Sequence, residues 1–161
     1  MEHKSVIDEE FVKRLCCGKP EAISFFLEWY AWVHGIDDLI DEGLGSGVPG
    51  LEPAEARQRI VNTFAQAVVV LSHPFYVKHV DALRMTAVLV ANRYADTVNY
   101  EYADKAESWQ KQWADHHRGV AMEMAIAVAL ICGGWAHARS LSQELVELCY
   151  YSHHDETGKP K

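Results

Sequence analysis

The sequence lacks most of the short motifs that identify common catalytic and metal sites. Its four cysteines form no CxxC pair, its histidines form neither an HExxH nor an ExxH pair, and no P-loop or GxSxG run is present. These absences argue against a zincin-type metal site, a di-iron bundle, a P-loop nucleotide site and a GxSxG serine site. The scattered histidines are expected at the surface or in hydrogen bonds.

Positive charge is scarce, because 15 Lys and Arg face 23 Asp and Glu and give a net charge of -8. A nucleic-acid surface needs a basic patch, so we expect no nucleic-acid partner. Unpaired cysteines and a polar N-terminal segment favour a cytoplasmic protein with neither disulfides nor a signal peptide. No membrane span is expected, since the most apolar run, 120–135, contains Glu123 and is shorter than about 20 residues.

Period-two alternation is also missing, so the sequence predicts an all-α fold. Long helices joined by short loops indicate an antiparallel helical bundle of about six helices in a single domain, 1–161. The Gly- and Pro-rich segment 43–53 is expected to be a flexible loop, either a lid or a connector, and 152–161 a frayed tail. Glycine and proline punctuation predicts helices over 8–15, 20–42, 53–72, 80–103, 108–132 and 136–151.

The most unusual feature that is present is an acidic helix end in the run HGIDDLIDE. Its carboxylates repel one another and lie at the end of the helix dipole that disfavours negative charge, so they must be solvated, paired or neutralised by a cation. At 100° per residue Asp37 and Asp41 share a stripe with Tyr30 and His34, beside the apolar arc, whereas Asp38 lies further round. An amphipathic helix with a solvated acidic face remains an equal alternative. The carboxylates are Asp37, Asp38, Asp41 and Glu42.

A second polar stripe lies on the predicted helix 80–103. This helix is apolar nearly all round from 82 to 102, so we expect it to be central. Asn92, Asp96 and Asn99 nevertheless recur at i, i+4 and i+7, flanked by Arg93. Polar groups on a buried helix need partners, either a hydrogen-bond network or a cation facing the first carboxylates. Oxygen ligands of this kind suit Mg²⁺.

On the predicted helix 108–132, Glu123 is the only charged residue between Arg118 and Arg139. His116 falls on the same helix face. A single Glu and a single His are weak evidence for a site, so we expect a structural pairing between them.

The DDLIDE run resembles the aspartate-rich DDxxD/E motif of class I terpenoid (isoprenoid diphosphate) synthases, particularly the HxxDDxxDE run of squalene and phytoene synthase-like proteins. An aromatic-rich helix, FFLEWYAWV, precedes the motif here too. The resemblance implies a terpenoid synthase-like bundle in which Asp37, Asp38 and Asp41 bind Mg²⁺. That Mg²⁺ holds the substrate diphosphate and promotes its departure.

The family's second motif, (N/D)xxx(S/T/D)xxxE, lies on a facing helix. Asn92 and Asp96 match its first two positions and are the implied further metal ligands. The third position falls on Tyr100, and Glu101 comes one residue late. The chain departs from the family's pattern at this ligand.

Together these features predict a protein that binds an isoprenoid diphosphate through Mg²⁺ and ionises or transfers it. Tyr30, His34 and Arg93 are the candidate substrate-binding residues. Because the chain is shorter than full synthases, a homodimer would complete the pocket, or the chemistry has been lost. Two alternatives stay open: an all-α nucleoside triphosphate pyrophosphohydrolase of the MazG and dimeric dUTPase type, and a non-catalytic helical interaction module.

Overall fold

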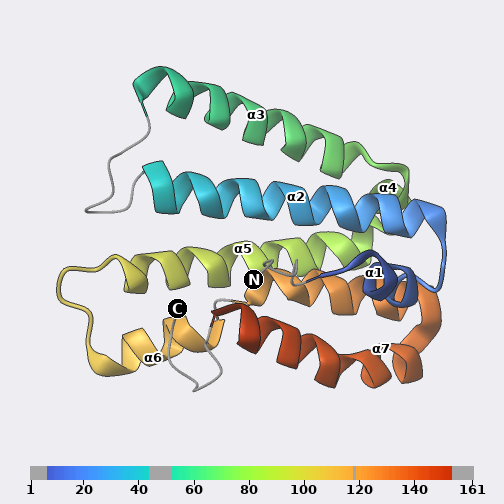
Figure 1. Cartoon of the computed structure of the whole chain (residues 1–161). Coiled ribbons are helices and arrows are strands. Elements are labelled where there is room, and N and C mark those ends of the chain that lie inside the picture. The colour runs from blue at the N-terminus through green and yellow to red at the C-terminus, as the bar shows by residue number, and fades with distance from the viewer. Residues whose placement is uncertain (1–6, 44–51, 118, 154–161) are drawn as a thin grey trace.

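A computed structural model describes residues 7–43, 52–117 and 119–153, and these ranges contain helices and no strand. The predicted all-α bundle is therefore confirmed (Figure 1). The described residues do not include 44–51 of the predicted loop or 154–161 of the predicted tail. Residues 152 and 153, which were predicted to belong to the tail, are part of the last helix. The elements are α1 Glu9–Leu15, α2 Pro20–Gly43, α3 Pro53–Ser72, α4 Pro74–Lys78, α5 Val80–Glu101, α6 Ser108–His117, the 3₁₀ turn η1 Val120–Met122 and α7 Glu123–His153.

Proline opens three of these helices. Pro20, Pro53 and Pro74 are the first residues of α2, α3 and α4, where the fixed φ suits a helix and the missing N–H would have no intrahelical partner. α1 begins differently, because the Asp8 carboxylate accepts a hydrogen bond of 2.7 Å from the Phe11 amide. This is an ordinary N-cap.

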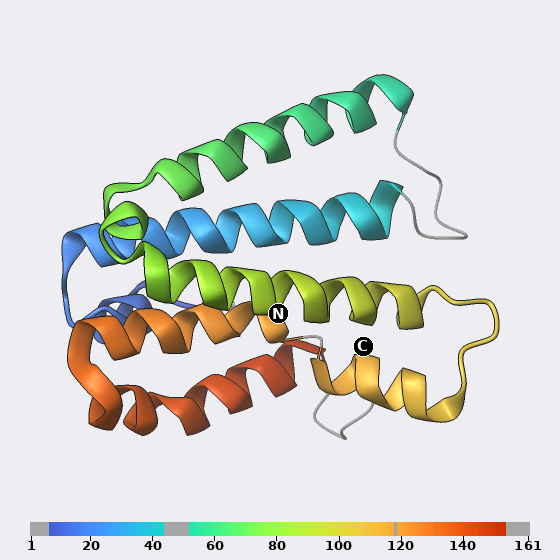
Figure 2. The same ribbon diagram turned by 180° about the vertical axis from the view of Figure 1, so that it is seen from behind.

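The helices are arranged around α2. α3 and α5 lie on either side of it, α6 lies beside α5, and α7 runs along the opposite edge (Figures 1 and 2). α2 and α3 are antiparallel, whereas α2 and α5 run in the same direction, because α3 and the short α4 bring the chain back. The core joins α1, α2, α5 and α7 through side chains that are almost completely buried, among them Phe11, Phe25, Phe26, Leu83, Met124 and Val128.

The predicted helix break at Gly133 and Gly134 is present inside α7. Gly134 has φ 78° and ψ -176°, so the chain turns back and the two halves of α7 lie side by side (Figure 2). Two contacts secure this turn: Lys19 Nζ donates to the Cys132 carbonyl at 2.8 Å, and His137 Nε2 donates to the Leu15 carbonyl at 3.1 Å. They pair carbonyls at helix ends that lack intrahelical partners.

Two predictions about the helices are wrong. The expected continuous helix 108–132 is interrupted, since α6 ends at His117 and the 3₁₀ turn η1 precedes α7. The expected central helix α5 buries only one stripe, containing Leu83, Val90 and Thr97, and exposes Met85 and Leu89 on its other side.

One stretch, Ser108–Leu148, contains a window with a mean hydropathy of 1.7 and could cross a membrane by length and composition alone. The expectation that no run is apolar enough is therefore not met by this measure. Met124 and Val128 of the stretch are fully buried in the bundle, and Gly134 breaks its helical geometry. About a third of the window, 33%, is buried inside the bundle.

Candidate functional site

The acidic end of α2 faces α5. The Tyr94 hydroxyl donates to Asp37 Oδ1 at 2.7 Å, and the Tyr102 hydroxyl donates to Asp41 Oδ1 at 2.5 Å. Because α2 and α5 run in the same direction, the two phenols meet the two carboxylates in the same order along the helices. The acidic stripe is thus anchored to a neighbouring helix.

A small crevice of about 80 Å³ lies between these two helices. This volume is several times what one water molecule needs. Three carboxylates line it, and no Lys or Arg does, so the crevice is strongly acidic. Its lining consists of Asp37, Ile40, Asp41, Tyr94, Thr97, Val98, Glu101 and Tyr102.

Both phenols act as permanent donors at neutral pH. Burial raises the pKa of Tyr94 well above its usual range, and the hydrogen bond to Asp37 raises it further. The hydrogen bond to Asp41 is the main cause of the raised pKa of Tyr102, with burial second.

The second predicted stripe does not reach this crevice. Asn92 and Asp96 are exposed and do not line it. At 100° per residue both lie about 160° round α5 from Tyr94, so they point away from α2 when Tyr94 points towards it. Within the single chain, the structure does not bring Asn92 and Asp96 to Asp37 and Asp41.

Of the other predicted residues, Asp38 is exposed and does not line the crevice. Tyr30 and His34 contact each other edge to face, with ring centroids 4.3 Å apart, and they do not line it either. The side chain of Glu42 lies outside the described residues. Asp37 and Asp41 are thus the two predicted ligands that share one cavity.

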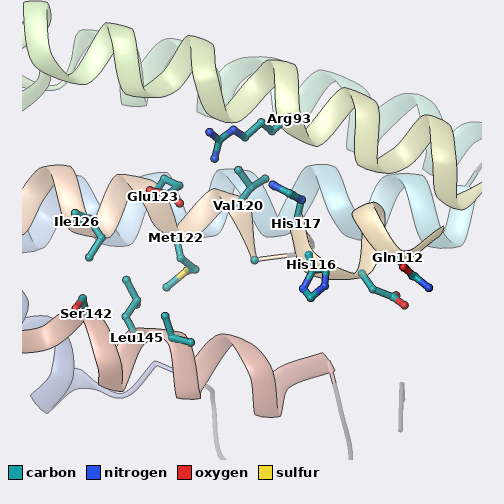
Figure 3. A pocket seen from close by; sticks show the side chains of 13 residues that line it. Arg93, Gln112, His116, His117, Val120, Met122, Glu123, Ile126, Ser142 and Leu145 are labelled. Atoms are coloured by element: carbon teal, nitrogen blue, oxygen red, sulfur yellow. The ribbon is translucent and has the colours of Figure 1, made fainter. Parts of the chain in front are cut away.

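A larger pocket of about 610 Å³ lies on another side of α5, against α6, η1 and α7 (Figure 3). Arg93, which we predicted for the substrate site, enters this pocket and not the crevice. The volume is ordinary for an organic ligand. The apolar wall is made by Val120, Met122, Ile126, Leu145 and Val146, and the polar lining includes Arg93, Gln112, Asp115, His116, His117, Glu123 and Ser142.

His117 of this pocket is held by two contacts. Its ring stacks on Trp113 at 3.9 Å between centroids, and its Nδ1 lies 2.9 Å from the Trp113 carbonyl oxygen. Because a carbonyl can only accept, Nδ1 carries a proton and donates to it. The pocket therefore offers the His117 ring, the Arg93 cation and an apolar wall to a small organic molecule.

The expected pairing of His116 with Glu123 is wrong. Both residues line the larger pocket, and neither a hydrogen bond nor an ion pair joins them in the described part of the chain. The interruption at η1 separates the helices that carry them, so the helix face assumed from the sequence does not exist.

Within the described ranges, no three His, Cys, Asp or Glu side chains converge closely enough to hold a metal ion by themselves. Mg²⁺ does not require such a cage, since it is usually held by one or two carboxylates together with phosphate and water. Asp37 and Asp41 supply two carboxylates of this kind in one crevice. The donor set fits Mg²⁺ bound together with a phosphate group.

No family model, curated protein or solved structure matches the chain. Its function is therefore inferred from the chemistry of the crevice and the pocket.

Proposed function

We propose that the protein binds a diphosphate-containing small molecule through Mg²⁺ at the crevice between α2 and α5. The observation that supports this proposal is the position of Asp37 and Asp41, which are turned towards α5 in a crevice shared with Glu101. Each aspartate accepts its phenol on Oδ1. Asp37 and Asp41 are the residues that would hold the cation.

The charge of the crevice makes a cation necessary. Its lining has three carboxylates and no basic side chain, and the whole chain carries a net charge of -8. A diphosphate without a metal would be repelled. Mg²⁺ would neutralise the phosphate oxygens, while Tyr94 and Tyr102 hold the two aspartates in place.

The organic part of the ligand defines two substrate classes. The resemblance of the DDLIDE run to class I terpenoid synthases favours an isoprenoid diphosphate, and a nucleoside triphosphate is the alternative. The crevice, at about 80 Å³, has room for a partly hydrated ion and phosphate oxygens only. A prenyl or nucleoside group would extend out of it.

Thermal unfolding with Mg²⁺ and pyrophosphate tests the proposal. Ligand bound to the folded state raises the melting temperature, by an amount equivalent to about 2.7 kcal/mol at a hundredfold excess over Kd. We expect a rise for the wild type and for the control Asp104→Asn, an exposed carboxylate in the turn after α5 that does not line the crevice. The double variant Asp37→Asn/Asp41→Asn should show none.

Replacing pyrophosphate with a prenyl diphosphate analogue and with nucleoside triphosphates then identifies the class. A larger rise with the prenyl compound supports the isoprenoid reading, and pyrophosphate release from nucleotides supports the alternative. If the wild type does not respond to any of these ligands with Mg²⁺, the proposal fails. It also fails if the double variant responds as strongly as the wild type.

A further inference from the structure

α3 has an unusual orientation for the outer helix of a bundle. It turns small and polar side chains towards α2, and Val70 is its only fully buried residue. Near the middle of the contact, a Cβ added to Gly35 of α2 would lie 3.4 Å from Gln66 Oε1 and 3.9 Å from Thr63 Oγ1. Apart from Val70, the large apolar side chains of α3 are thus exposed and not buried against the rest of the bundle.

Five of these exposed apolar side chains lie together on the outward face, and Val69 lies outside this group. At 100° per residue they fall within an arc of about 100°, so they form one continuous stripe along the helix. Phe64 is 72% exposed and Val61 is 60% exposed, which is far more than a core position allows. We call this surface the α3 stripe; it comprises Ile60, Val61, Phe64, Val68 and Leu71.

Charge is absent from the same part of the helix. No Asp, Glu, Lys, Arg or His occurs from Ile60 to Ser72, although charged residues make up 24% of the chain. Interface centres are depleted in charge and contain aromatic side chains, whereas an ordinary exposed helix face is charged. Exposed apolar patches of this kind mark an interaction surface.

We propose that the α3 stripe pairs with the α3 stripe of a second copy of this chain, with the two helices antiparallel about a twofold axis. The sequence of the stripe is self-complementary in that arrangement. Phe64 and Val68 are equally distant from Gln66 along the helix, and so are Val61 and Leu71. A twofold axis that crosses the helix pair at the level of Gln66, on the outward side, therefore sets Phe64 against the partner's Val68 and Val61 against the partner's Leu71.

The same arrangement satisfies two general requirements of a homodimer. In a twofold-symmetric contact both copies use the same surface, so the assembly stops at a dimer. Antiparallel helices also place opposite ends of their dipoles together. A helix face about 30 Å long and about 10 Å wide covers on the order of 300 Å² on each copy. This is below the usual size of stable interfaces, so we expect a weak dimer that forms only as the protein concentration rises.

Sedimentation velocity over a range of protein concentrations tests the dimer. We expect the wild type to change from an 18.2 kDa monomer to a species of twice that mass as concentration rises. Phe64→Glu should stay monomeric at every concentration, with an unchanged far-UV circular dichroism spectrum. Leu89→Glu, which places the same charge on the exposed face of α5, should dimerise like the wild type.

A charge-swap experiment tests the register and does not depend on a loss of binding alone. Val61→Lys and Leu71→Glu should each weaken the dimer at least tenfold, and the double variant should regain most of the lost affinity, because opposite charges then face each other twice. A wild type that remains monomeric overturns the proposal. So does a chain that forms open-ended oligomers, a dimer that Leu89→Glu breaks while Phe64→Glu does not, or a double variant no better than either single one.

Discussion

At the scale of single residues, two phenols determine what the acidic run of α2 can do. A solvated acidic face would leave Asp37 and Asp41 pointing to water, but each accepts a hydrogen bond from a tyrosine of α5. Hydrogen bonds to ionised acceptors are stronger than neutral ones and fix the carboxylate in one orientation. The sequence identified the aspartates from their repulsion, whereas the tyrosines looked like ordinary aromatic residues of an apolar helix.

The tyrosines should also make the protein sensitive to alkali. The pKa values of Tyr94 and Tyr102 are raised in the folded state, and burial raises the pKa of the Cys16 thiol to about 12. A group with a raised folded pKa contributes its stability fully below its unfolded pKa and loses it as pH rises through the folded value. The free energy of unfolding should therefore fall above about pH 9 to 10, where unfolded Cys and Tyr ionise.

Urea unfolding between about pH 8 and about pH 11 measures this dependence. The double variant Tyr94→Phe/Tyr102→Phe should lose less stability across that range, since only Cys16 among these three groups remains to ionise. Equal losses for the variant and the wild type would show that the phenols do not hold their protons in the folded state.

At the scale of helices, most boundaries were predictable because proline and glycine mark them. Pro20 and Pro53 open α2 and α3, as predicted, and the Gly133–Gly134 break is real. The interruption before η1 was missed because Trp113 and Val120, seven residues apart on either side of it, fall on one face of a continuous helix. α4 was missed because it has only five residues.

The distance of Asn92 and Asp96 from the crevice was not predictable for a related reason. A helix that is apolar nearly all round does not show which side its own chain covers, so α5 was expected to be central. The structure covers the side with Leu83 and Val90 and leaves the line of Met85, Asn92 and Asp96 exposed. Which side of α5 is buried depends on its tertiary contacts, and no pattern in the sequence indicates that side.

The turn inside α7 should require glycine at position 134 because of the backbone conformation there. Gly134, at φ 78° and ψ -176°, has a conformation that is almost restricted to glycine, although a Cβ there would meet no atom within 4 Å. Gly134→Ala should therefore destabilise the protein by about 1–3 kcal/mol through strain alone. Gly35→Ala, in the helical part of α2 with only ordinary contacts, is the matched control and should be neutral or stabilising.

Chemical denaturation of both variants gives the comparison. Equal effects of the two substitutions would contradict the assigned conformation of Gly134. Gly133→Ala adds a steric test, because its Cβ would lie 2.5 Å from Cδ2 of His137 and would displace the ring that caps the Leu15 carbonyl.

At the scale of the whole molecule, the core is unevenly shared. α1, α2 and α7 bury large side chains together, and a paired contact from both Arg14 nitrogens to Glu144, at 2.9 and 2.6 Å, joins α1 to the second half of α7. α3 contributes one fully buried residue and exposes its apolar stripe. The same chain therefore contains a well-packed unit and one helix that needs a further surface to cover it.

Hydrogen exchange should reveal this difference. Local opening is easiest where few apolar contacts are buried, so in dilute solution the amides of α3 should exchange much faster than those of the central turns of α2 or of the first half of α7. Raising the protein concentration should slow exchange in α3 selectively, because the dimer covers the α3 stripe, while the other helices stay unchanged. The variant Phe64→Glu should abolish the concentration dependence without altering protection around Met124. If α3 in the dilute wild type is as protected as α7, the helix is stable within a single chain and its exposed stripe does not need a partner.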